Sequence, residues 1–152
     1  MASFIRINGG ESIDTVASAT SQAFYVIRGK GSSVSELGTV EWNEGDLFVL
    51  PQCDGKISHS AAAAAAAGGA ESAALYWVTD APLLSYLGVR PSERRFQLTV
   101  YRRSRLLEEV ERIKHQPGAE HRCVPSSVVT LRTRQRHRRH TLRARAGTVW
   151  VC

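Results

Sequence analysis

Apolar and polar positions alternate with a period near two along much of the chain before Asp80, in short runs that turn residues separate. Each run is also rich in aromatic and β-branched residues, which favours strands. The pattern predicts strands at 4–7, 22–28, 34–36, 39–42, 47–50, 57–60 and 73–79. Short strands with turn signals every ten or so positions indicate an antiparallel sandwich or barrel rather than a fold of alternating strands and helices.

Glycine and proline mark where these strands end. The run Gly29-Lys30-Gly31 predicts a tight turn that needs positive φ, and Leu37-Gly38 predicts the tip of a hairpin. Pro51 should close a strand because it cannot donate to a ladder. Seven alanines at 61–67, followed by two glycines, are too few to nucleate a helix alone and predict a loop insertion.

The pattern changes to a helical one after Asp80. Residues 81–87 begin with a proline near the first helical position and end at Gly88, which predicts a short helix. Residues 96–101 predict an extended segment. A second, amphipathic helix is predicted at 104–114, with an apolar stripe of Leu106, Val110 and Ile113 and with i,i+4 pairs Arg105/Glu109 and Glu108/Arg112. That stripe must be covered, either by the flank of the barrel or by another domain, and a partner chain in a homo-oligomer is a further candidate.

Length and composition set limits on the class of protein. With 152 residues, 43% hydrophobic and 22% charged, the chain has room for one ordinary globular core. No apolar run is long enough for a membrane span, and no secretory segment opens the chain, so we expect a cytoplasmic protein with no membrane association. The cysteines, Cys53, Cys123 and Cys152, are odd in number and widely spaced, so they suggest neither a disulfide framework nor a zinc site.

The net charge of +6 comes from the end of the chain. Residues 124–152 hold seven arginines and no acidic residue, whereas residues 1–123 hold 13 Lys and Arg against 14 Asp and Glu. We therefore divide the chain into a domain at 1–123 and an Arg-rich tail at 124–152, which lacks a clear apolar period and is expected to be disordered. The tail is open to three readings: a phosphate-binding arm, an ordinary solvated tail, and a frame-shifted product of GC-rich DNA. The last is favoured, so nucleic acid is not a favoured partner.

Several phrases together resemble the cupins, and more narrowly the N-terminal half of bicupins similar to gentisate 1,2-dioxygenase. They are residues 22–31, Glu41-Trp42, Gly45-Asp46-Leu47-Phe48-Val49-Leu50-Pro51, His59, and the run from Leu75 to Leu84. The likeness covers about residues 4–122. It implies an all-β fold: a single jelly roll, or double-stranded β-helix, with one or two short helices near its C-terminal end.

The resemblance also implies an Fe(II) site, and this chain departs from it. The first cupin motif places its acidic ligand at Gln22 and its histidine pair at Val16 and Ser18, or one residue earlier at Thr15 and Ala17. The histidine of the second motif is matched by His59 alone. One imidazole and a weak amide oxygen do not make a tight iron site. We therefore expect that this chain does not bind the family's Fe(II), with His59 as the one weak metal candidate.

The function implied is that of the N-terminal barrel of a gentisate-dioxygenase-like ring-cleaving enzyme, truncated, with an incomplete metal site and inactive alone. One alternative is an Fe(II)-dependent aromatic-ring dioxygenase that acts as an oligomer. Another is a non-catalytic cupin that binds a small aromatic acid at the barrel mouth. Its candidate pocket residues are Tyr25, Trp42 and Trp77, with Arg28 as carboxylate partner.

Overall fold

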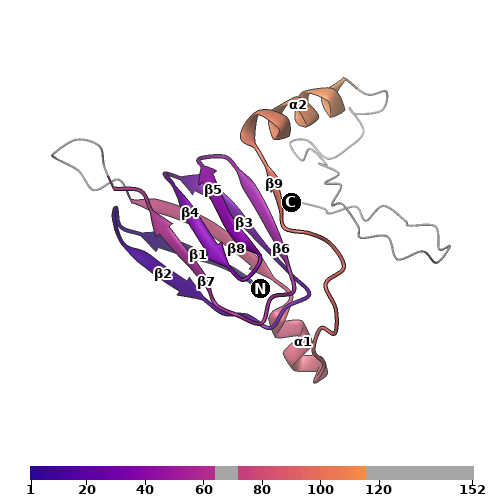
Figure 1. The fold of residues 1–152 in the computed structure, drawn as a ribbon. Helices are drawn as coiled ribbons and strands as arrows, with labels where there is room; N and C mark the ends of the chain where they lie inside the picture. Colours follow the sequence, from indigo (N-terminus) through magenta and orange to yellow (C-terminus); the bar gives the residue numbers. More distant parts are fainter. Residues whose placement is uncertain (64–71, 116–152) are drawn as a thin grey trace.

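The computed structural model describes residues 1–63 and 72–115 and places them in two antiparallel β-sheets with two helices (Figure 1). One sheet has the order β1-β8-β3-β6-β9. Its strands are β1 (Ala2–Ile7), β8 (Ala73–Thr79), β3 (Ser21–Arg28), β6 (Leu47–Pro51) and β9 (Thr99–Tyr101). The other has the order β2-β7-β4-β5. Its strands are β2 (Ser12–Thr15), β7 (Ile57–Ala61), β4 (Lys30–Ser35) and β5 (Gly38–Asn43).

The strand pairs are nested. β1 pairs with β8, β2 with β7, β3 with β6 and β4 with β5, as in one long hairpin. This hairpin is rolled up, because β3 also pairs with β8 and β4 with β7. Nested antiparallel pairs wound into two facing sheets are a jelly roll. The all-β prediction of a single cupin-type jelly roll is therefore confirmed by the order of the strands themselves.

The core lies between the two sheets. Strand parity sends alternate side chains inward, as the buried positions of β3 show: Gln22, Phe24 and Val26 are buried, whereas Tyr25 is exposed. Most of the interior is apolar. The main buried apolar side chains are Ile5, Ile7, Phe24, Val26, Val40, Trp42, Phe48, Leu50, Ile57 and Leu75.

The strands predicted from the sequence all appear, with two differences. Lys30 and Gly31 belong to β4, so the predicted three-residue turn is reduced to Gly29, whose φ of +86° is easily reached without a Cβ. The sequence pattern also gave no prediction for β2. This edge strand was missed because its one buried residue is the polar Thr15 and Ile13 is the only apolar residue among its four, so no alternating apolar pattern marks it.

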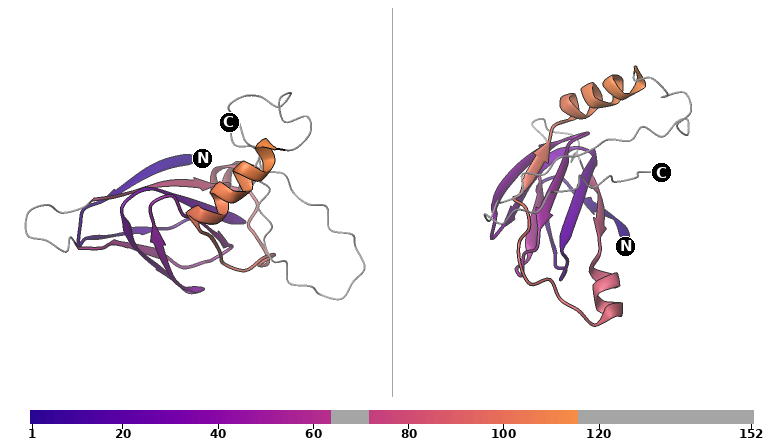
Figure 2. Two further views of the ribbon diagram at one scale, coloured as in Figure 1. Left: turned by 90° about the horizontal axis from the view of Figure 1, so that it is seen from above. Right: turned by 90° about the vertical axis from the view of Figure 1, so that its right-hand side faces the viewer.

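The helices lie at opposite ends of the roll (Figures 1 and 2). α1 (Ala81–Leu87) ends at Gly88, as predicted, but buries none of its residues. α2 (Arg103–Lys114) buries Ile113. Its ion pairs differ from the prediction, because Glu109 pairs with Arg112 and Glu111 with Lys114, each at i,i+3. Neither described helix is long and apolar enough to cross a membrane.

The loop at the alanine run and the basic tail lie largely outside the described residues. β7 takes up Ala61, the first residue of that run. The domain boundary predicted at 123/124 and the tail at 124–152 are both beyond the described part of the chain.

Candidate functional site

The interior of the five-stranded sheet carries a stack of three aromatic rings. Phe24 on β3 is paired in register with Trp77 on β8 and with Phe48 on β6. Its ring centroid lies 5.0 Å from that of Phe48 and 5.9 Å from that of Trp77, with interplanar angles of 11° and 4°. Cross-strand aromatic pairs at such distances contribute packing energy beyond their buried area. The stack therefore covers part of the inner face of the five-stranded sheet with packed aromatic rings.

His59 faces this stack from the opposite sheet. It sits in the middle of β7, fully buried, with its ring 4.7 Å from the ring of Phe24. Both ring nitrogens have hydroxyl partners: Nε2 is 2.9 Å from Thr15 Oγ1, and Nδ1 is 2.7 Å from Ser33 Oγ. Burial lowers the pKa of His59 to about 4, and the charge of Asp14 opposes this only in part. The imidazole is therefore neutral at physiological pH.

The hydrogen bonds also indicate which nitrogen carries the proton. Trp42 Nε1 donates to Ser33 Oγ over 2.8 Å, so Ser33 is left with its own hydroxyl proton to give. The acceptor within reach is Nδ1 of His59. The imidazole proton must then be on Nε2, from which it is donated to Thr15 Oγ1. These proton positions are assigned from the network. With them, each polar side-chain atom of the buried cluster has a hydrogen-bond partner.

This donor set does not fit the iron that the cupin resemblance implies. Among the described residues no three His, Cys, Asp or Glu side chains lie close enough to share a metal ion. His59 could offer a nitrogen lone pair outward only by giving up one of its two hydrogen bonds, and its ring is packed against aromatic carbons. No reaction step through a bound metal follows from this arrangement.

Gln22, at the position of the family's acidic ligand, is also a core residue here. Its side-chain carbonyl accepts a hydrogen bond from Trp77 Nε1 over 3.2 Å, and its amide nitrogen donates to Cys53 Sγ over 3.6 Å. Burial raises the pKa of the Cys53 thiol, so that thiol stays protonated at neutral pH.

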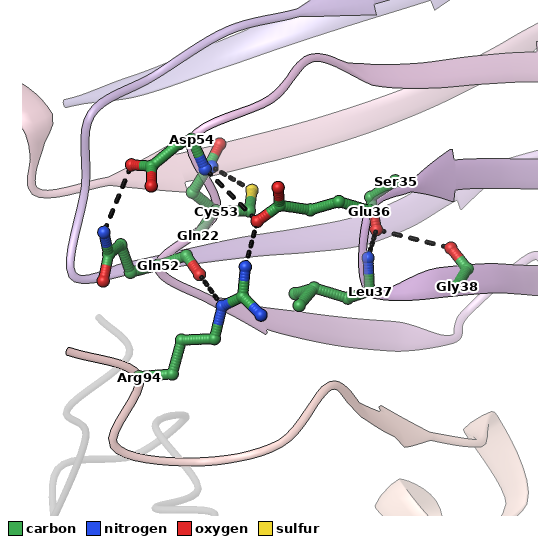
Figure 3. A network of polar contacts seen from close by, with 9 residues as sticks. All are labelled: Gln22, Ser35, Glu36, Leu37, Gly38, Gln52, Cys53, Asp54 and Arg94. Carbon is green, nitrogen blue, oxygen red and sulfur yellow. Dashed lines mark hydrogen bonds and ion pairs between the residues drawn. The ribbon is translucent and has the colours of Figure 1, made fainter.

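Polar contacts close the end of the roll around Cys53 (Figure 3). Glu36, in the turn between β4 and β5, forms an ion pair with Arg94 and accepts a hydrogen bond from the backbone nitrogen of Asp54 over 3.4 Å. Arg94 Nε donates to the carbonyl of Gln52 over 3.0 Å. These contacts join the β4–β5 hairpin, the loop after β6 and the segment that follows α1.

A hollow of about 640 Å³ opens beside this network, which we call the rim hollow. It is bounded by the connection between β2 and β3, the loop after β6, helix α1 and the residues after it. Its lining includes Val16, Ser18, Cys53, Leu84, Val89 and Arg90. The resembled family's motif places histidines at Val16 and Ser18. In this structure these two positions lie at the rim of the roll, whereas His59 lies inside it.

The four predicted pocket residues do not come together. Tyr25 and Arg28 are exposed on the outer face of β3. Strand parity points Tyr25 away from the core, and a register shift between Val26 and Arg28 pairs Arg28 with Ala74 and brings it to the same outer face. Trp42 is buried on β5, where it lines a smaller hollow of about 330 Å³, and Trp77 belongs to the aromatic stack. None of the four lines the rim hollow.

Sequence reasoning missed Thr15 and Ser33, the two hydroxyl partners of His59. Thr15 was considered only as a place where a histidine was missing. A signal was present in β7, where the inward positions on either side of His59 are the apolar Ile57 and Ala61. β4 carried none, because Ser33 lies between Gly31 and Ser35 on the inward side and Val34 points outward. Two polar residues at core positions of paired strands predict a mutual hydrogen bond.

Comparisons with known proteins give distant matches in structure. No protein-family model matches the chain, and no curated protein sequence matches it. A salicylate 1,2-dioxygenase variant from Pseudoaminobacter salicylatoxidans, solved in complex with gentisate, is 22% identical, with a TM-score of 0.47 over 66% of this chain and 23% of that one. This chain thus spans about a quarter of the dioxygenase's length.

Two other solved structures are shorter matches. The EutQ protein of Clostridium difficile is 19% identical, with a TM-score of 0.38 over 51% of this chain and 53% of that one. A cupin-2 domain protein from Shewanella frigidimarina is 13% identical, with a TM-score of 0.37 over 50% of this chain and 65% of that one. The assignment of the fold rests on the strand order, and by that order the described residues form a cupin-type jelly roll.

Proposed function

We propose that this chain is a non-catalytic cupin-type domain: the structural or substrate-shaping barrel of a larger, gentisate-dioxygenase-like assembly whose iron is held elsewhere. The observation that carries the proposal is the state of His59, which is locked between two hydroxyl groups and packed against the aromatic stack. A buried, neutral, fully hydrogen-bonded histidine stabilises a core, and it leaves no open coordination position for substrate and dioxygen. The link to ring cleavage rests on the sequence motifs described above.

Iron binding tests this proposal. The purified chain is incubated anaerobically with Fe(II) and desalted, and its iron is measured by elemental analysis, beside the His59→Leu variant. We expect far less than one iron per chain, and the same residual amount in both proteins. A wild-type ratio near one that falls in the variant, together with oxygen uptake on addition of gentisate, supports the alternative of an oligomeric Fe(II) dioxygenase and contradicts the proposal.

The rim hollow favours a second candidate function, the binding of a small aromatic acid. Its volume lies within the range of small-molecule sites. Val16, Leu84 and Val89 offer apolar contact, and the guanidinium of Arg90 can pair with a carboxylate. On this second proposal the acid binds at the rim rather than beside Tyr25 and Arg28.

Calorimetric titration with salicylate and gentisate tests this second function. We expect millimolar or tighter binding that is lost in Arg90→Gln and kept in Arg28→Gln, a control that removes an exposed arginine from the outer face of β3. Absence of heat with the wild-type chain, or loss of binding in the Arg28 variant instead, contradicts binding in the rim hollow.

A further inference from the structure

The turn between β1 and β2 joins the two sheets of the roll and has the sequence Asn8-Gly9-Gly10-Glu11. The backbone amide of Glu11 donates to the carbonyl of Asn8 over 3.0 Å, and Gly10 has a φ of +79°. A hydrogen bond from the fourth residue to the first, with positive φ at the third, defines a type II β-turn. Gly10 therefore occupies the position that requires a glycine.

The turn does not need a glycine at position 9. Gly9 is the second residue of the turn, where φ is negative and most residues fit, and it is not one of the glycines with positive φ. Because Gly9 has no Cβ, it has no side chain to cover its own backbone nitrogen, and its backbone can leave the turn conformation easily. Among residues 1–63 and 72–115, no backbone carbonyl accepts a hydrogen bond from this nitrogen. It is therefore a free nucleophile next to the side chain of Asn8.

The side chain of Asn8 is held only by an exposed contact. Asn8 lies on the surface, and its Nδ2 donates to Glu11 Oε2 over 2.9 Å. Hydrogen bonds of an exposed turn open at little cost in free energy. Once this turn opens, the nitrogen of Gly9 can reach Cγ of Asn8, because the two atoms close a five-membered ring.

We propose that Asn8 is a self-modification site, at which the backbone nitrogen of Gly9 attacks the carboxamide of Asn8 and converts this residue to a mixture of aspartate and isoaspartate. The nitrogen of Gly9 gives its proton to a solvent base and forms a bond to Cγ of Asn8. The bond from Cγ to Nδ2 breaks, and the leaving nitrogen takes a proton from water and departs as ammonia. Water then opens the succinimide ring at either of its two carbonyl groups. Water is consumed and ammonia is released, and no electrons are transferred.

The product changes the place where the two sheets are joined. A carboxylate at position 8 cannot donate to Glu11, and it repels the carboxylate of that residue. The isoaspartate form also adds a carbon atom to the main chain within the turn. Two hydrogen bonds tie this turn to the end of β7, from Gly10 N to Ala61 O over 3.2 Å and from Ala61 N to Glu11 O over 3.1 Å. The modification therefore loosens the junction of β1, β2 and β7, and it depends neither on the role of His59 nor on the rim hollow.

Asn43 is the only other asparagine of the chain and serves as an internal control. It ends β5 and also opens a turn, in which the amide of Asp46 donates to its carbonyl over 3.0 Å. The following residue is Glu44, whose side chain crowds the backbone nitrogen that would have to attack. The two asparagines are thus alike in the start of a turn and differ in the residue that follows.

Timed incubation of the full chain in mildly alkaline buffer, followed by peptide mapping with mass spectrometry, tests the proposal. We expect the Asn8 peptide to gain the mass difference between a carboxamide and a carboxylic acid and to separate into aspartate and isoaspartate forms. The Asn43 peptide should stay unchanged over the same time. An isoaspartyl methyltransferase supplied with S-adenosylmethionine should label the isoaspartate form. Gly9→Ala keeps a negative φ at the second turn position, so we expect it to fold normally and to lose most of the conversion.

The same incubation in urea shows whether the folded turn is itself reactive. Conversion of Asn8 in the folded chain, with Asn43 intact, supports the proposal. Conversion of Asn8 only in urea, or in neither condition, overturns it, because the turn then protects the residue. Equal conversion of Asn43, or undiminished conversion in a folded Gly9→Ala variant, also overturns it. If Gly9→Ala does not fold, the comparison of Asn8 with Asn43 in the folded wild-type chain decides.

Discussion

His59 illustrates how a residue at a motif position can acquire a structural role. In the sequence it is the one match to the metal-binding histidines of the resembled family. In the structure its ring packs on Phe24, and its nitrogens are bonded to Thr15 and Ser33. Sequence reasoning identified the residue and the absence of its co-ligands. It could not supply the two hydroxyl partners, because they lie 44 and 26 residues away and meet His59 only through strand pairing.

The low pKa of His59 predicts a pH dependence of stability. The folded pKa is about 4, below the ordinary 6.5, so the unfolded chain takes up a proton at a pH where the folded chain does not. The contribution of the neutral imidazole to the free energy of unfolding is therefore fully present above pH 6.5, and it is lost as the pH falls to about 4. The loss amounts to about 3 kcal/mol.

Urea unfolding at a series of pH values measures this loss. His59→Leu should be less stable than the wild type near neutral pH by about 2 kcal/mol, since Thr15 Oγ1 loses its partner. It should also lack the part of the decline between pH 6.5 and about 4 that belongs to the imidazole. Equal slopes for wild type and variant across that range are incompatible with a buried, neutral His59.

At the scale of elements, β4 is held unusually close to its neighbours at Gly31. A Cβ on this residue would lie 2.1 Å from the carbonyl oxygen of Ser60 and 2.5 Å from the ring of Trp42. The sequence placed Gly31 in a turn because glycine often serves there. Its actual role is to allow the backbone of β4 and the indole of Trp42 to approach each other, which depends on the register of three strands.

Gly31→Ala should therefore destabilise the fold by about 3 kcal/mol or more, because the added methyl group must displace backbone or a buried ring. The matched control is Gly55→Ala, where the nearest atom to an added Cβ is 3.8 Å away and the backbone needs no positive φ. We expect it to change stability by less than about 0.5 kcal/mol. Chemical unfolding of both variants gives the comparison, and similar stabilities would argue against the close approach at β4.

Asp46 connects the β5–β6 turn to the start of α2. Its carboxylate accepts hydrogen bonds from the backbone nitrogens of Asn43 and Arg103 and forms an ion pair with Arg102 at 2.8 Å. Burial alone would raise the pKa of Asp46, but these contacts together hold it below its usual value. The sequence showed Asp46 only as part of a turn, because its partners at the start of α2, Arg102 and Arg103, are 56 and 57 residues further on.

Asp46→Asn should lower the free energy of unfolding by about 1–3 kcal/mol, since an amide of the same size loses the ion pair and one acceptor. The wild-type stabilisation is present above pH 3.8 and is lost as the pH falls through the lower folded pKa. Hydrogen exchange should show faster exchange in the first turn of α2 in the variant than in the wild type. Unchanged exchange there would mean that Asp46 does not anchor the helix.

For the whole molecule, the strand pattern was sufficient to predict the architecture. Turn residues and period-two runs located eight of the nine described strands, and the motif phrases indicated a jelly roll. The sequence did not reveal that apolar side chains line up on the outer face of the five-stranded sheet, because rows such as Phe4, Tyr76 and Tyr25 form only when the strands pair. The same holds for the rim hollow, whose walls come from three separate segments of the chain.

The nested topology predicts slow folding. Apart from the β4–β5 hairpin, the strand pairs join segments that are far apart in the chain, so each pays a large loop-closure cost before it gains contacts. Stopped-flow refolding at low protein concentration should show relaxation times of about milliseconds to seconds. A microsecond phase that recovers the full native signal would be inconsistent with this topology.

The central claim is that His59 is a neutral, doubly hydrogen-bonded core residue and not a metal ligand. Long-range ¹H–¹⁵N correlation NMR of the histidine side chains, recorded as a function of pH and with one equivalent of Zn²⁺ as a redox-inert probe, measures this directly. We predict an Nε2–H tautomer, a pKa of about 4 and no change in the His59 signals on addition of metal. A pKa near the ordinary 6.5, or a metal-induced shift of either His59 nitrogen, would contradict the account.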